Sequence, residues 1–90
     1  MPNIKLFASL RKVTGTKELS ITGASAGEVI SELVKRHPDL AAHLLENGQI
    51  RPHVIITING HPATDMDTLV TEQDQIAIFP PIAGGQGEYL

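Results

Sequence analysis

A β-hairpin is encoded by residues 54–62, which read Val54-Ile55-Ile56-Thr57-Ile58-Asn59-Gly60-His61-Pro62. β-Branched side chains favour the first strand of this hairpin, which we expect to run from His53 to Asn59. Asn59-Gly60 supplies two residues that tolerate the positive φ angles of a type I′ turn. Pro62 cannot donate to a ladder, so we expect the returning strand to be short and to lie at a sheet edge.

Two further strands are predicted near the start of the chain. Residues 4–9 alternate with period two, which is typical of a strand, and we expect Ile4, Leu6 and Ala8 to face one side together. Residues 13–16 resemble a turn around Gly15. Residues 18–21 alternate again, Leu19 and Ile21 with Glu18 and Ser20, and lie close enough to form a hairpin with the strand at residues 4–9.

The main helix is predicted after Ser25-Ala26-Gly27-Glu28, which has the form of a capping box. Apolar residues then recur at helical spacing, and Pro38 disfavours helical geometry at the preceding residue, so the helix should end there. Glu32 and Arg36 are spaced for a favourable ion pair on the exposed side. The buried side is expected to carry Val29, Ile30, Leu33, Val34 and His37.

The segments on either side of the hairpin are less regular. A short second helix is predicted over residues 39–46, with Leu40, Leu44 and Leu45 inward, and it should end at Asn47-Gly48 with Gly48 in the left-handed conformation. Residues 65–75 are polar and rich in turn formers. Leu69 is the large apolar residue of that loop, and we expect it to be buried.

The order of elements indicates an α+β fold in which one main helix packs on one face of a mixed sheet. Residues 75–79 form the last predicted strand, and periodicity is lost beyond it. We therefore divide the chain into a folded domain, residues 1–79, and an extended tail, residues 80–90. By topological analogy we expect a β-grasp, the ubiquitin-like arrangement, with the first and last strands parallel in the middle of the sheet.

The composition excludes several classes of protein. The 90 residues have seven Lys plus Arg, ten Asp plus Glu and a net charge of -3, so we expect no nucleic-acid or membrane partner. The absence of Cys excludes a disulfide scaffold, a thiolate zinc site and a thiol nucleophile. The four histidines are not spaced as metal ligands, so no metal is expected. Without a secretory signal, the chain should be cytoplasmic.

The residues after the last strand carry a recognisable ending, which reads Phe79-Pro80-Pro81-Ile82-Ala83-Gly84-Gly85. It closely resembles the C-terminal signature of the small subunit of molybdopterin synthase, and less closely that of the thiamine-pathway sulfur carrier. Both belong to the MoaD/ThiS-like branch of the ubiquitin-like proteins. Further agreement comes from the element order, the length up to Gly85, Leu6-Phe7-Ala8 with Leu10-Arg11, and Ile58-Asn59-Gly60.

The resemblance implies a sulfur carrier rather than an enzyme. In this branch an E1-like enzyme uses ATP to adenylate the terminal glycine, and sulfur then replaces the adenylate to give a thiocarboxylate. The resemblance makes Gly85 the activated residue and Pro80, Pro81, Ala83 and Gly84 the tail that presents it. It implies molybdopterin as the product, with the large subunit of molybdopterin synthase or another sulfur acceptor as the second partner. The chain itself would bind no cofactor.

The tail also suits that chemistry on physical grounds. Pro80 to Gly85 can extend roughly 20 Å beyond the last strand. Pro80 and Pro81 stiffen its base, whereas Gly84 and Gly85 lack a Cβ and can enter a narrow channel. Because the chain has no Cys to hold a persulfide, a sulfur carrier of this composition must use its C-terminal carboxylate.

Gly85 is followed by Gln86-Gly87-Glu88-Tyr89-Leu90, and a peptide-bonded glycine has no carboxylate to activate. Three explanations stay open: a protease removes the extension, the extension is foreign to the natural protein, or the chain no longer carries sulfur. We favour removal by a processing protease because Ile82-Ala83-Gly84-Gly85 is intact.

Three apolar residues are out of phase with the predicted core. Phe7, Ile55 and Phe79 should project from the sheet face that the helix leaves open, and together they would form a patch for a partner. Basic side chains could form a rim near the tail that meets an acidic partner.

Two other functions remain as alternatives. The first is a protein modifier that is conjugated to lysines through Gly85. The second is an interaction module that uses the patch alone and has an inert tail.

Overall fold

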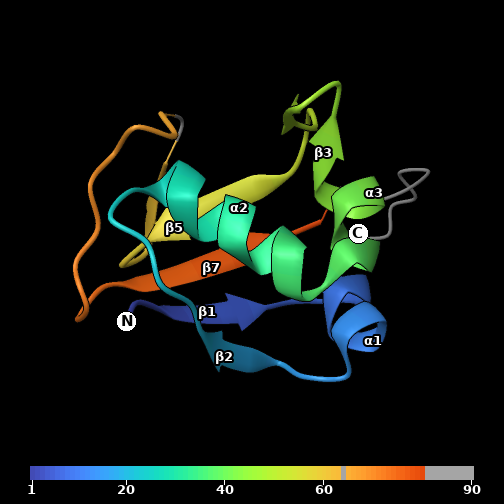
Figure 1. Ribbon diagram of the computed structural model, residues 1–90, viewed down its shortest axis with the longest axis horizontal. Helices are drawn as coiled ribbons and strands as arrows, with labels where there is room; N and C mark the ends of the chain where they lie inside the picture. The colour runs from blue at the N-terminus through green and yellow to red at the C-terminus, as the bar shows by residue number, and fades with distance from the viewer. Residues whose placement is uncertain (64, 81–90) are drawn as a thin grey trace.

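Strands β1 (Asn3–Leu6) and β7 (Gln75–Phe79) lie side by side and run parallel (Figure 1). The structure is a computed structural model that describes residues 1–63 and 65–80. Within it, β2 (Glu18–Ser20) flanks β1, and β5 (Ile55–Ile58) flanks β7, both antiparallel. The two-residue β6 (His61–Pro62) completes the sheet in the order β2-β1-β7-β5-β6. The α+β fold and the β-grasp arrangement of the first and last strands are confirmed.

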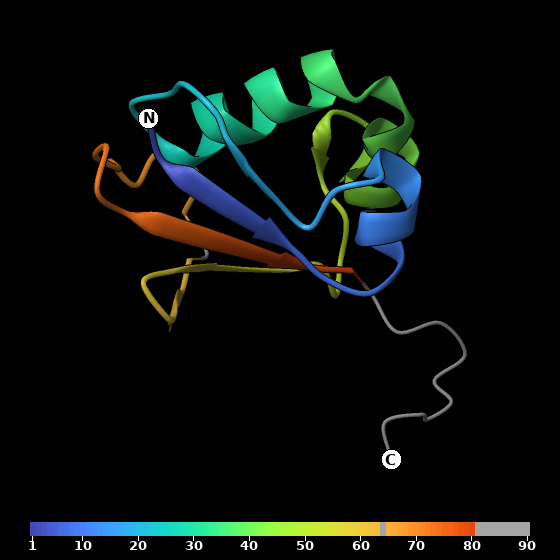
Figure 2. The ribbon, with the colours of Figure 1, turned by 90° about the horizontal axis from the view of Figure 1, so that it is seen from below.

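The main helix, α2 (Ala26–Arg36), packs across one face of this sheet, and Figure 2 shows the two layers edge-on. Ser25 Oγ accepts a hydrogen bond from the backbone N–H of Glu28 at 3.2 Å, so the predicted cap is confirmed. The helix ends before Pro38, as predicted. The predicted ion pair between Glu32 and Arg36 was wrong. Glu32 instead lies 4.0 Å from Lys35, and Arg36 donates a hydrogen bond to the carbonyl of Ser20 at 3.3 Å.

The core lies between these two layers. It consists of the inward residues of β1, β5 and β7, the buried side of α2 and a few residues from the connecting segments. Its buried members are Ile4, Leu6, Leu10, Ile21, Val29, Ile30, Leu33, Leu40, Leu44, Ile56, Val70, Ile76 and Ile78. No helix within residues 1–63 and 65–80 has the length and apolarity that a bilayer crossing requires.

The first strand is shorter than predicted, and a helix follows it. The strand ends at Leu6, Ala8 is exposed, and α1 (Ser9–Thr14) begins directly afterwards. Ala8 has φ 54° and ψ -131°, and the N–H of Leu10 donates to the carbonyl of Phe7 at 3.2 Å. This tight turn ends the strand alternation, so that Ala8 is exposed and Leu10 reaches the core from the first turn of α1.

The segment after α2 also differs from the prediction. A 3₁₀ turn, η1 (Pro38–Leu40), leads into α3 (Ala41–Leu44), which ends two residues early. β3 (Leu45–Glu46) and β4 (Gln49–Ile50) then pair antiparallel around Asn47-Gly48. Both turn residues have positive φ, 55° and 79°, so Asn-Gly builds a second hairpin here instead of ending a helix.

The loop before β7 buries a different residue from the predicted one. Leu69 is 78% exposed, whereas Val70 is 7% exposed and joins the core. Leu69 forms an isolated antiparallel bridge with Ser25, and the N–H of Val70 donates to the carbonyl of Ala24 at 3.0 Å. Side chains alternate in extended chain, so the inward position of Val70 turns Leu69 outward.

The hairpin at Asn59-Gly60 is confirmed. The two residues have φ 53° and 85°, and β6 is the short edge strand that Pro62 predicts. β5 is shorter than expected, because His53 lies in a turn with φ 71°.

Candidate functional site

The open face of the sheet, opposite α2, carries an apolar patch that consists of Phe7, Ile55 and Phe79. Ile55 is paired with Phe79 across β5 and β7, and Phe7 extends β1 by donating its N–H to the carbonyl of Ile78 at 3.2 Å. The Phe7 and Phe79 rings stack with their centroids 4.4 Å apart. Ile55 is 53% exposed, and both Phe residues are half-buried. The structure thus brings together all three residues that the sequence selected.

The apolar patch is confined to one end of the open face. Two residues back along the strands, the same face carries Lys5, Ala77 and Thr57 in register. The patch therefore lies where β7 ends and the tail begins.

The tail starts at this end of the sheet. Pro80, which is half-buried, is the last residue that the structure describes. Pro81, Ala83, Gly84 and Gly85, with the extension from Gln86 to Leu90, lie outside the described residues, as does most of the proposed tail region 80–90.

Three basic side chains gather beside the patch. The guanidinium carbon of Arg11 lies 5.0 Å from the centroid of the Phe7 ring, and Arg11 Nε donates to the carbonyl of Leu6 at 2.7 Å. Arg11, Lys12 and Lys17 line one shallow hollow. By contrast, Arg51 lies 3.9 Å from Glu46, and Lys35 is on α2. The sequence predicted a basic rim near the tail but did not show which cations lie together, because α1 was not predicted.

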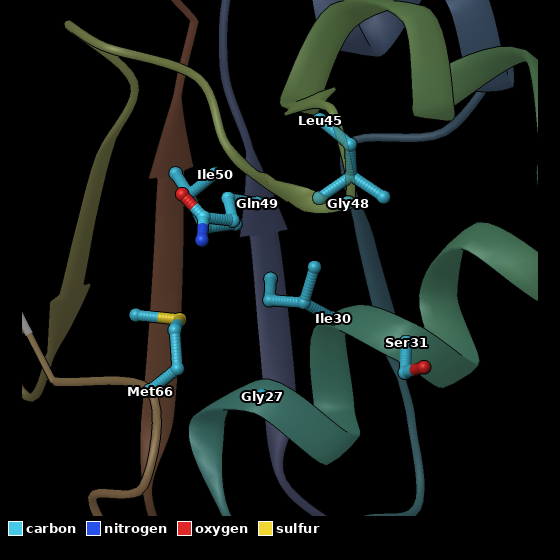
Figure 3. Close-up of a pocket in the computed structure, with 8 residues that line it drawn as sticks. All are labelled: Gly27, Ile30, Ser31, Leu45, Gly48, Gln49, Ile50 and Met66. Carbon is cyan, nitrogen blue, oxygen red and sulfur yellow. The ribbon is translucent and has the colours of Figure 1, made fainter.

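A groove lies elsewhere, between α2 and the β3–β4 hairpin, and has a volume of about 510 Å³ (Figure 3). It was not predicted, because the hairpin at Asn47-Gly48 was not recognised. No titratable side chain lines it, so it offers no acid or base for chemistry. Its lining residues are Gly27, Ile30, Ser31, Leu45, Gly48, Gln49, Ile50 and Met66.

Titratable groups do not converge on a reaction centre in the described part of the chain. Within residues 1–63 and 65–80, no three His, Asp or Glu side chains are grouped as metal ligands. The pKa of Asp74 is lowered, mainly by the side-chain amide of Asn59 and then by the backbone N–H of Thr71. These contacts tie the Asn59-Gly60 turn to the start of β7, which is a structural role.

Comparison with known proteins places this geometry in context. The model of the ThiS family matches residues 4–85. Small archaeal modifier protein 3 of Haloferax volcanii is 33% identical over 88 residues, which cover 91% of this chain and 96% of that protein. The molybdopterin synthase sulfur carrier subunit of Arabidopsis thaliana is 32% identical over 85 residues, which cover 91% of this chain and 80% of that protein.

A solved structure agrees in fold. The solution structure of small archaeal modifier protein 1 from Methanosarcina acetivorans is similar with a TM-score of 0.84 and 32% identity, and the match covers 92% of this chain and 94% of that one. The ubiquitin-like architecture expected from the tail signature is therefore confirmed. With a family match over most of its length, the chain belongs to the ThiS family.

Proposed function

We propose that this protein carries sulfur as a thiocarboxylate on Gly85. Hydrolysis of the Gly85–Gln86 peptide bond consumes one water and gives Gly85 a free carboxylate. That carboxylate attacks the α-phosphorus of ATP in an E1-like adenylating enzyme, and pyrophosphate leaves. A hydrosulfide-equivalent donor then attacks the acyl adenylate, AMP leaves, and the thiocarboxylate remains. ATP is bound by the partner and not by this chain.

The observation that carries the proposal is the position of Gly84-Gly85. The pair follows the end of β7 by a few residues, and the family match ends at Gly85. The extension from Gln86 to Leu90 lies beyond the part that the family shares, which supports its removal by a processing protease.

The chain is a small carrier that acts with partner enzymes rather than catalysing a reaction itself. The apolar patch lies at the base of the tail, so a partner that receives the tail can contact Phe7, Ile55 and Phe79 at the same time. The adenylating enzyme is the first such partner. For the second we infer the large subunit of molybdopterin synthase or another sulfur acceptor, since relatives such as the Arabidopsis thaliana protein are named as carrier subunits of that synthase.

Intact mass of the untagged protein from its own cells tests the proposal. We expect a species that ends at Gly85, part of it with one oxygen replaced by sulfur. A single species that ends at Leu90, even when cells require the sulfur-containing product, would contradict the proposal. Deletion from Gly84 onward should abolish sulfur transfer, and survival of sulfur transfer would exclude Gly85 as the residue that carries the sulfur.

A protein modifier conjugated through Gly85 is the second candidate. It is favoured by the likeness to small archaeal modifier proteins 3 and 1 of Haloferax volcanii, at 33% and 31% identity. It predicts branched peptides in which Gly85 is joined to a lysine of another protein. Those peptides, found without any thiocarboxylate, would favour the modifier over the sulfur carrier.

A further inference from the structure

The hollow beside the apolar patch concentrates positive charge on an acidic chain. The whole chain has seven Lys plus Arg and a net charge of -3, yet Arg11, Lys12 and Lys17 line this one hollow with Gly15 and Thr16. No acidic residue is among those five. Within residues 1–63 and 65–80, none of the three cations lies within 4.0 Å of a carboxylate. We call these three residues the basic cluster.

Arg11 is held in a fixed orientation within the basic cluster. Its guanidinium lies over the Phe7 ring at 5.0 Å, and its Nε is engaged by the carbonyl of Leu6 at 2.7 Å. The described residues accept no hydrogen bond from its two terminal nitrogens. Such a planar group, fixed on one side and open on the other, suits bidentate binding of a carboxylate.

The backbone around the hollow disfavours phosphate. Phosphate sites in loops use several free N–H groups that converge on the anion. Here the N–H of Gly15 donates to the carbonyl of Arg11, and the N–H groups of Thr16 and Glu18 donate to Thr14 Oγ1 and Thr16 Oγ1. The ligand must therefore be recognised by the side chains of the basic cluster.

The basic cluster is continuous with the patch that we assign to the partner, because Phe7 contacts both Arg11 and Phe79. Arg beside aromatic residues is typical of the energetically important part of an interface. We propose that the basic cluster binds an acidic segment of the adenylating enzyme. In this complex Arg11 would bind one carboxylate of the enzyme while the apolar patch contacts the enzyme surface. This inference rests on the proposed function for the identity of the partner.

The cluster can be tested without the enzyme, by nuclear magnetic resonance of the full ¹⁵N-labelled chain. The probes are a hexaglutamate peptide blocked at both ends and, separately, pyrophosphate. We expect the peptide to shift the amide signals of residues 11–17 and the Arg11 Nε–H signal, and to do so more weakly at high salt. Shifts spread equally over Lys5, Lys35 and Arg51, or tighter binding of pyrophosphate than of the peptide, would overturn the proposal.

Variants separate binding from structure. Arg11→Gln should weaken peptide binding about tenfold, because a charge-assisted hydrogen-bonded pair is lost. The double variant Lys12→Gln/Lys17→Gln keeps the contact with Phe7 and should weaken binding about threefold. Lys35→Gln makes the same change of charge on the exposed side of α2 and should leave binding unchanged. Equal losses of peptide affinity in all three variants would mean that binding depends only on the net charge of the protein, which would contradict the proposal.

The enzyme assay then addresses the partner. With the processed protein as substrate in ATP–pyrophosphate exchange, Arg11→Gln should raise KM about tenfold at unchanged kcat. An unchanged KM would overturn the assignment of the partner. If the wild-type chain is not adenylated at all, the proposed function fails, whereas the peptide titration still decides whether the basic cluster binds carboxylates.

Discussion

The ring of Phe7 stacks on the ring of Phe79 with 15° between their planes, and so joins the chain after β1 to the last residue of β7. One ring precedes the turn into α1, and the other precedes the tail. The stack therefore couples the position of the basic cluster to the point where the tail leaves the sheet. A partner that contacts the stack contacts a surface whose parts are already fixed relative to one another.

The stack should contribute measurable coupling to stability. In a double-mutant cycle of Phe7→Leu and Phe79→Leu, we expect a coupling free energy of about 1 kcal/mol, the typical worth of an aromatic pair beyond its buried area. Urea denaturation of the two single variants and the double variant measures it. The matched cycle of Phe7→Leu with Thr57→Ala, a residue on the same face that lies across β7, should give coupling near zero. Equal coupling in the two cycles would contradict a specific stack.

Ile55 should matter to the partner far more than to the fold. Because its side chain is 53% exposed, Ile55→Ser should change the free energy of unfolding by less than about 1 kcal/mol. The same variant should weaken binding to the adenylating enzyme by about 30-fold, as expected for an apolar residue at the centre of an interface. Titration calorimetry measures this loss. Leu69→Ser is the matched control, since Leu69 is exposed but lies in the loop bridged to Ser25.

Ala8 holds a backbone conformation that is unfavourable for any residue with a Cβ. With φ 54° and ψ -131°, it occupies a region that glycine adopts without strain and that other residues rarely adopt. We therefore expect Ala8→Gly to raise the free energy of unfolding by about 1 kcal/mol in urea denaturation. Ala42→Gly, in the exposed part of α3, should instead lower it by about 0.5–1 kcal/mol. A loss of stability in both variants would show that Ala8 is not strained.

Gly23 is required for close packing rather than for its backbone angles. A Cβ at this position would lie 2.6 Å from Val29 Cγ2 and 2.8 Å from the Val29 backbone nitrogen. Since the backbone of α2 cannot yield easily, Gly23→Ala should cost about 2–3 kcal/mol in thermal or urea unfolding. At Gly48 an added Cβ meets open space and only the positive φ is unfavourable, so Gly48→Ala should cost about 1 kcal/mol. A smaller cost at Gly23 than at Gly48 would contradict this order.

The fold was predictable where the conformation favoured by a short stretch of sequence is also the one that packs in the folded protein. The type I′ turn at Asn59-Gly60 and the cap at Ser25 depend on two to four adjacent residues, and both occur as predicted. The missed elements depend on contacts between distant residues. Nothing near Ala8 indicates a positive φ, and the helix that follows this turn buries Leu10 in a core whose other members come from the whole chain.

The candidate site was predictable to the same extent. Period-two alternation is enough to place Phe7, Ile55 and Phe79 on one sheet face, because their strands are neighbours in the β-grasp. The position of Arg11 over Phe7 was not predictable, since it requires α1. The partner role of these residues stays a prediction that the binding experiments above test.

Asp74 should make stability depend on pH in the acid range. Its pKa is lowered in the folded protein, first by the hydrogen bond from the side chain of Asn59 at 2.9 Å and then by the backbone N–H of Thr71 at 2.8 Å. A lowered folded-state pKa means that the unfolded chain takes up the proton more readily. The contribution is therefore present above the unfolded pKa and is lost as pH falls through the folded pKa, below about 4.

The measurement is the free energy of unfolding between neutral pH and about pH 3. Asp74→Asn should flatten the acid part of the curve, because the titrating group is gone. Asn59→Gly keeps the positive φ that this turn requires and removes the first cause of the shift, so it should flatten the curve in part. If the wild type and both variants lose stability in parallel as the pH falls, the bond between Asn59 and Asp74 does not hold the carboxylate in its charged form.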